Sequence, residues 1–85
     1  MAVFQVEDRD APRILITEPL AEVGMDLLRR ELPEALIDQR FGLAPAQLRA
    51  VIGSYTALII RSETRVTADL LAAASRLQVI GRAGS

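Results

Sequence analysis

The chain has 85 residues, of which 51% are hydrophobic and 25% charged, and a net charge of −1, a balance typical of one small globular domain. It contains no Cys and no His, which excludes disulfides, thiolate metal sites and the most common general base. All of its cations are arginines, a usage that favours bidentate anion recognition, although a GC-rich genome gives the same bias.

The chain has no basic stripe and no apolar run approaching the ~18 residues of a membrane span, which argues against nucleic-acid and membrane partners. The apolar run at the start is too short for a signal peptide, and acidic residues follow it early. We therefore expect a cytoplasmic protein.

Residues 1–12 are expected to form a flexible leader, because a run of charged residues precedes Pro12. The domain itself should span residues 13–85. It opens with the apolar run Ile14–Ile16, which is typical of a strand covered on both faces in a parallel sheet.

An amphipathic helix is predicted next and should end at Pro33. Its apolar side chains recur at helical spacing and are expected to face the core: Leu20, Val23, Leu27 and Leu28. Residues 35–37 predict a second, weaker strand. Pro45 fits the first position of a second helix, whose inner face should carry Leu48, Val51 and Ile52.

The strongest strand pattern covers residues 57–60. Thr67 is predicted to cap a third helix, whose inner face should hold Leu70, Leu71 and Ala74. Residues 77–80 predict a fourth strand that ends at Gly81.

Strands and helices alternate along this chain, which predicts an α/β fold with a parallel sheet and right-handed crossovers. We expect a flavodoxin-like wound sheet of four strands and three helices, with strand order 2-1-3-4. The sheet should be incomplete, because a fifth strand and its covering helix would normally protect the edge formed by the fourth strand.

In a wound sheet, ligands bind beyond the carboxyl ends of the strands, where the strand order reverses. Here that place lies between the first and third strands, which deliver Thr17 and Glu18 from one end and Arg61 and Ser62 from the other. Arg82 should project from the end of the fourth strand. Neighbouring strands are ~4.8 Å apart, so we expect Arg61 and Arg82 to stand close together and to bind a phosphate or carboxylate.

The alternative is that Arg61 forms an ion pair with Glu18 or Glu63 and that Arg82 merely caps the end of the chain. Residues 81–85 are small apart from Arg82 and could let the backbone approach a ligand, but they do not form a G-x-G-x-x-G loop. Residue content alone leaves both possibilities open.

Three stretches resemble the D-3-phosphoglycerate dehydrogenases, a branch of the D-isomer-specific 2-hydroxyacid dehydrogenase family. Ile14–Gly24 is similar to that family's opening strand and loop. Tyr55–Thr67 resembles the family stretch D-A-L-I-V-R-S-x-T-K-V-T, with Thr56 and Arg65 as departures. Leu77–Gly84 matches the family stretch L-K-V-I-G-R-A-G, and the resemblance covers about residues 13–85.

The resemblance implies an enzyme that oxidises 3-phosphoglycerate to 3-phosphohydroxypyruvate in serine biosynthesis, with NAD as hydride acceptor. It implies that Arg61, Ser62 and Arg82 bind the substrate and that Ser85 touches the cofactor side of the cleft. It also implies oligomers in the full-length family.

The family's Rossmann domain and its catalytic Arg, Glu and His have no counterpart in this sequence. We therefore expect an N-terminal fragment of the substrate-binding domain without activity of its own. One alternative is a stand-alone module that binds small anions. A phospho-acceptor receiver domain fits poorly, because it needs an acid where Arg61 and Ser62 follow the third strand.

Overall fold

The computed structural model describes residues 11–83. In chain order, the elements are β1 (Arg13–Ile16), α1 (Glu22–Glu31), β2 (Leu36–Gln39), α2 (Pro45–Val51), the 3-10 turn η2 (Ile52–Ser54), β3 (Ala57–Ile60), α3 (Ala68–Ala73) and β4 (Val79–Arg82). The expected leader, apart from residues 11 and 12, and Ser85 both lie outside the described residues. No helix within residues 11–83 is long and apolar enough to cross a membrane.

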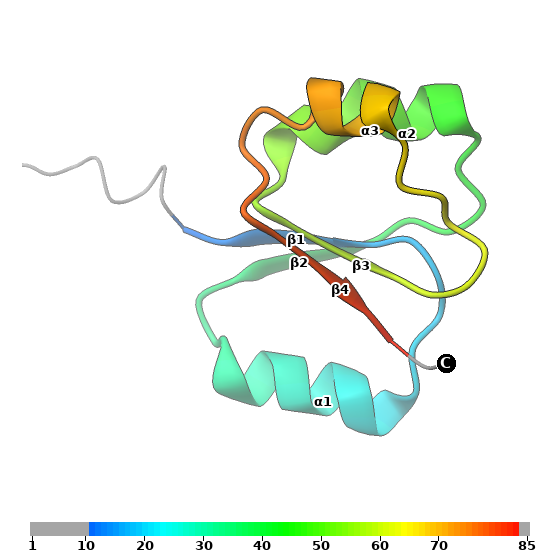
Figure 1. The fold of residues 1–85 in the computed structure, drawn as a ribbon. Helices are drawn as coiled ribbons and strands as arrows, with labels where there is room; N and C mark the ends of the chain where they lie inside the picture. Colours follow the sequence, from blue (N-terminus) through cyan, green and yellow to red (C-terminus); the bar gives the residue numbers. More distant parts are fainter. Residues whose placement is uncertain (1–10, 84–85) are drawn as a thin grey trace, which may run out of the picture.

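The four strands form one parallel sheet in the order β2-β1-β3-β4, which confirms the predicted wound topology. Helix α1 covers one face, and α2 and α3 cover the other (Figure 1). The chain therefore leaves β1 on one face and β3 on the opposite face. The strand order reverses between these two neighbours, so a gap for a ligand is expected at their carboxyl ends.

The core has two parts, one on each face of the sheet. Leu15 and Leu58, which are Cα partners in β1 and β3, belong to the cluster under α2 and α3. Ile14 and Ile16 belong to the cluster that Met25 of α1 covers. Because successive side chains of a strand point to opposite faces, the apolar run of β1 fills both clusters.

Three predicted core positions are wrong. Val23 and Leu27 of α1 are 76% and 49% exposed, and Leu71 of α3 is 50% exposed. Helix α1 meets the sheet through Met25 and the half-buried Leu28 instead, so its inner row is rotated from the predicted one. Apolar residues occur on two sides of this helix, and periodicity alone does not choose between them.

The fourth strand also differs from its prediction. Strand β4 continues through Gly81 to Arg82, and Ala83 still donates a backbone hydrogen bond to Ile60 at 2.8 Å. Arg82 is therefore a strand residue rather than a loop residue. Its side-chain direction is set by the pleat of the sheet, which affects the site described below.

Candidate functional site

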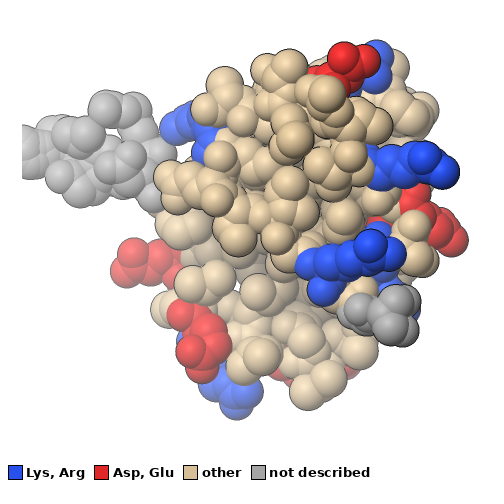
Figure 2. Space-filling view, in the orientation of Figure 1, with Lys and Arg blue, Asp and Glu red and all other residues tan. Residues whose placement is uncertain are grey.

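The polar groups predicted to form a site lie at the carboxyl ends of β1, β3 and β4. Thr17 and Glu18 follow β1, residues 61–67 connect β3 to α3, and Arg82 ends β4. In a parallel sheet these ends share one edge. Figure 2 shows basic side chains at the side of the molecule where β3 and β4 end.

Glu18 links the ends of β1 and β3 at this edge of the sheet. It is only 8% exposed, and its carboxylate accepts three backbone hydrogen bonds from the loop after β3. Oε2 accepts from the N–H groups of Arg61 at 2.7 Å and Thr64 at 2.9 Å, and Oε1 accepts from Glu63 at 3.0 Å. We call residues 61–64 the Glu18-bound turn.

These contacts keep Glu18 ionised. Burial acts to raise its pKa, but hydrogen bonds from the Thr64 side chain and from the backbone of Arg61, Glu63 and Thr64 outweigh burial and lower the pKa from 4.5 to about 2. A carboxylate with so low a pKa does not accept a proton near neutral pH. Glu18 is therefore not a candidate general base.

The low pKa of Glu18 predicts a pH-dependent stability. Between pH 4.5 and about 2, Glu18 stays ionised in the folded chain but binds a proton in the unfolded chain. Its contribution to the free energy of unfolding is therefore complete above pH 4.5 and is lost as the pH falls towards about 2. Urea unfolding at a series of pH values should show this loss. Glu18→Gln should weaken the dependence between pH 4.5 and 2, and an unchanged slope would contradict the assignment.

Arg61 and Ser62 are exposed at the tip of β3, as predicted. The guanidinium of Arg61 donates from Nη1 to the carbonyl oxygen of Pro19 at 3.1 Å. Among the described residues it forms no ion pair with Glu18 or Glu63. The alternative ion pair is therefore not formed. Glu18 instead accepts a hydrogen bond from the backbone N–H of Arg61, and the positive charge of the Arg61 side chain stays available.

Arg82 does not stand beside Arg61 as expected. It is the Cα partner of Ile60, and opposite residues of parallel strands share a face. Ile60 belongs to the cluster under α2 and α3, so Arg82 leaves the sheet on that face. The Arg61 side chain reaches the other way, to Pro19 in the connection to α1. The two cations therefore flank the edge from opposite faces.

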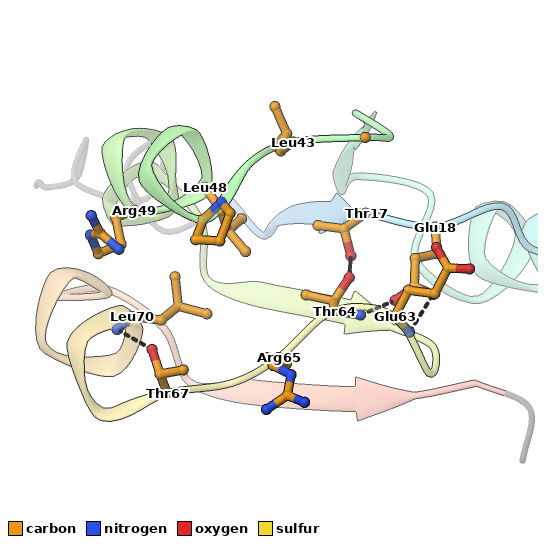
Figure 3. A pocket seen from close by; sticks show the side chains of 12 residues that line it. Thr17, Glu18, Leu43, Leu48, Arg49, Glu63, Thr64, Arg65, Thr67 and Leu70 are labelled. Carbon is orange, nitrogen blue, oxygen red and sulfur yellow. Dashed lines mark hydrogen bonds between the residues drawn. The ribbon is translucent and has the colours of Figure 1, made fainter.

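A pocket of about 260 Å³ opens on the α2 and α3 side of the same edge (Figure 3). Thr17 and Thr64 line it with their hydroxyl oxygens 2.8 Å apart, and Glu18 and Glu63 line it beside them (Figure 3). Its apolar lining includes Leu48 and Leu70. Two arginines, Arg49 and Arg65, also line it. Three of the predicted site residues do not line this pocket within the described part of the chain: Arg61, Ser62 and Arg82.

Sequence reasoning missed the roles of Thr64 and Arg65, and it placed Glu18 at the edge without its true partners. The one sequence feature that indicated these contacts was an acidic residue just after a buried strand, at the same end of the sheet as the loop that follows β3. Ser85, the predicted cofactor contact, lies outside the described residues.

Residues 11–83 contain no group of three or more acidic, His or Cys residues that would hold a metal ion. The sequence also lacks the G-x-G-x-x-G loop that holds a dinucleotide pyrophosphate at a helix N-terminus. The described residues therefore do not supply a dinucleotide-binding loop by themselves.

Comparison with known proteins agrees with this sheet and its motifs. The family model of the D-isomer specific 2-hydroxyacid dehydrogenase catalytic domain matches residues 14–85. D-3-phosphoglycerate dehydrogenase 2, chloroplastic, of Arabidopsis thaliana is 46% identical over 74 residues, which are 86% of this chain and 11% of the relative. D-3-phosphoglycerate dehydrogenase of Synechocystis is 35% identical over 72 residues, which are 85% of this chain and 12% of the relative.

Solved structures show the same fold. The TT0316 protein of Thermus thermophilus has a TM-score of 0.69 and 28% identity over 86% of this chain and 24% of its own. The NAD+-bound 3-phosphoglycerate dehydrogenase of Entamoeba histolytica has a TM-score of 0.70 and 20% identity over 88% of this chain and 26% of its own. The chain thus spans about a tenth to a quarter of the proteins it resembles.

Proposed function

The chain belongs to the D-isomer specific 2-hydroxyacid dehydrogenase family, and on this premise we propose that it forms part of the substrate-binding domain of an NAD-dependent 3-phosphoglycerate dehydrogenase. The observation that carries the proposal is the Glu18-bound turn. It presents Arg61 and Ser62 at the edge where a wound sheet binds ligands. The similarity of this chain to D-3-phosphoglycerate dehydrogenases supports the choice of substrate and the place in serine biosynthesis.

The proposed ligand contacts follow from charge and position. Arg61 binds the phosphate or carboxylate of the substrate with the donors that Pro19 leaves free, because a guanidinium carries five N–H groups. Ser62 adds a hydroxyl group from the same turn. Arg82 approaches the ligand from the opposite face of the edge, so that a doubly charged substrate lies beyond the sheet between the two cations.

NAD enters the proposal as the hydride acceptor of the complete family enzyme. Ser85 remains the predicted contact of this chain with the cofactor side. The 85 residues contain no His, Cys or Lys that could act as base or nucleophile, so we expect them to bind substrate without turnover.

Calorimetry with 3-phosphoglycerate tests the proposal. We expect saturable binding by the 85-residue chain, at least about tenfold tighter than binding of glycerate, which lacks the phosphate and one charged contact. Incubation with NAD and 3-phosphoglycerate should give no NADH absorbance. Equal affinity for both ligands, or no binding of either, would contradict the substrate assignment.

A second candidate is an anion-binding module that acts without a dehydrogenase. It is supported by the order of the Glu18-bound turn, which three backbone hydrogen bonds to Glu18 and one hydroxyl contact with Thr17 hold. The affinity distinguishes the two functions. Micromolar binding at physiological salt favours the module, whereas millimolar binding favours a domain that needs further contacts from the rest of an enzyme.

A further inference from the structure

We propose that Glu18 is a positioning residue, which holds the Glu18-bound turn in the conformation that presents Arg61 and Ser62 to the ligand. This inference rests on the proposed function of that turn. It extends the site to a buried side chain from the segment that follows β1.

The distribution of the three hydrogen bonds supports this role. Oε2 binds the first and last N–H groups of the turn, those of Arg61 and Thr64, and Oε1 binds Glu63 between them. One carboxylate therefore fixes both ends of a four-residue turn. Within the described part of the chain, Ser62 is the turn residue that Glu18 does not bind, and it stands exposed.

The path of the chain explains why a side chain is needed here. The last backbone hydrogen bond between the two strand ends runs from Thr17 to the carbonyl of Ile59 at 3.2 Å. Beyond it the two segments diverge, one to α1 on one face and the other to α3 on the opposite face (Figure 1). Without Glu18, three N–H groups at this divergence would lose their acceptor, which is costly in a partly buried loop.

The residues on either side of Glu18 contact the same turn. The Thr17 hydroxyl lies 2.8 Å from the Thr64 hydroxyl, and the Pro19 carbonyl accepts the guanidinium of Arg61. Three consecutive residues after β1 thus hold the turn through hydrogen bonds of the chain itself. Such pre-organisation raises affinity because less conformational entropy is lost on binding.

The experiment compares Glu18→Gln with Glu31→Gln, which removes an exposed carboxylate from the last residue of α1, outside the Glu18-bound turn. Hydrogen exchange of the Arg61, Glu63 and Thr64 amides reports the order of the turn, and calorimetry reports the affinity for 3-phosphoglycerate. For Glu18→Gln we expect exchange at these amides to accelerate at least about tenfold more than exchange at core amides, and affinity at least about tenfold lower. Glu31→Gln should bind 3-phosphoglycerate as tightly as the wild type and leave exchange at the turn unchanged.

The two readouts separate this inference from the proposed function. Unchanged exchange in Glu18→Gln, or faster exchange with wild-type affinity, overturns the positioning role. A wild type that binds no 3-phosphoglycerate refutes the proposed function, and the exchange data then still decide whether Glu18 holds the turn. If Glu18→Gln does not fold, Glu18→Asp replaces it: intermediate exchange and affinity support the role, and wild-type values of both overturn it.

Discussion

Replacing Leu58 by Ala should leave the chain largely unfolded at room temperature. Leu58 is fully buried in the central strand β3 and packs in the cluster under α2 and α3. Removing a buried Leu side chain costs about 2–5 kcal/mol, because apolar contacts are lost and a cavity remains. A domain of this size has a total stability of only about 3–5 kcal/mol from its core, so one such loss consumes most of it.

Urea unfolding followed by circular dichroism measures this effect, and Leu71→Ala is the matched control. Leu71 is the same residue type but is 50% exposed on α3, so its truncation should change the free energy of unfolding by less than about 1 kcal/mol. Equal losses in the two variants would show that the assignment of inner and outer helix faces is wrong.

Replacing Arg61 by Ala should weaken binding of 3-phosphoglycerate by about 10- to 100-fold. A hydrogen bond between charged groups contributes about 1.5–3 kcal/mol, and the exposed guanidinium offers more than one such bond to an anion. Arg61→Lys keeps the charge but loses the planar fork, so it should recover only part of the affinity. Calorimetry at fixed salt compares the variants.

Two control variants locate the ligand. Arg29 lies on α1 and pairs with Asp26 at 3.6 Å, so Arg29→Ala should leave the affinity unchanged. Arg49 lines the pocket between α2 and α3 rather than the tip of β3. A larger loss in Arg49→Ala than in Arg61→Ala would place the anion in that pocket and contradict the proposed site.

The sheet was predictable from local sequence because its strongest signals are short apolar runs. The run that became β1 is buried on both faces, and the run that became β3 is buried on one face and half-buried on the other. Their alternation with helices indicated a parallel sheet, which the structure has. The N-cap at Thr67 was also a local feature, and its hydroxyl accepts the N–H of Leu70 at 3.1 Å. Each of these elements depends on residues close together in the chain.

The inner faces of the helices were less predictable. Val23 and Leu27 have the same spacing as a buried row, but the sheet is narrow and α1 reaches it only along Met25 and Leu28. Helix α3 is six residues long, and Leu70 alone is buried within it. The row of apolar side chains that faces the sheet depends on how each helix packs in the tertiary structure. The periodicity of the sequence carries no information about that packing.

The candidate site was predictable in place but not in detail. Strand ends put Glu18, Arg61 and Arg82 at one edge, as the structure shows. The three contacts of Glu18 join residues 43 to 46 positions apart, and no local pattern encodes them. Because β4 extends to Arg82, the pleat of the sheet sets the direction of its side chain, and the predicted end at Gly81 did not include that constraint.

Amide chemical shifts of the 85-residue chain, recorded while 3-phosphoglycerate is added, test the central claim most directly. We predict saturable shifts that are largest at residues 61–64, with smaller shifts at Arg82 and Ala83 on the neighbouring strand end. Shifts that centre on α1, or on the pocket residues Leu48, Arg49 and Leu70, with Arg61 and Ser62 unchanged, would contradict it.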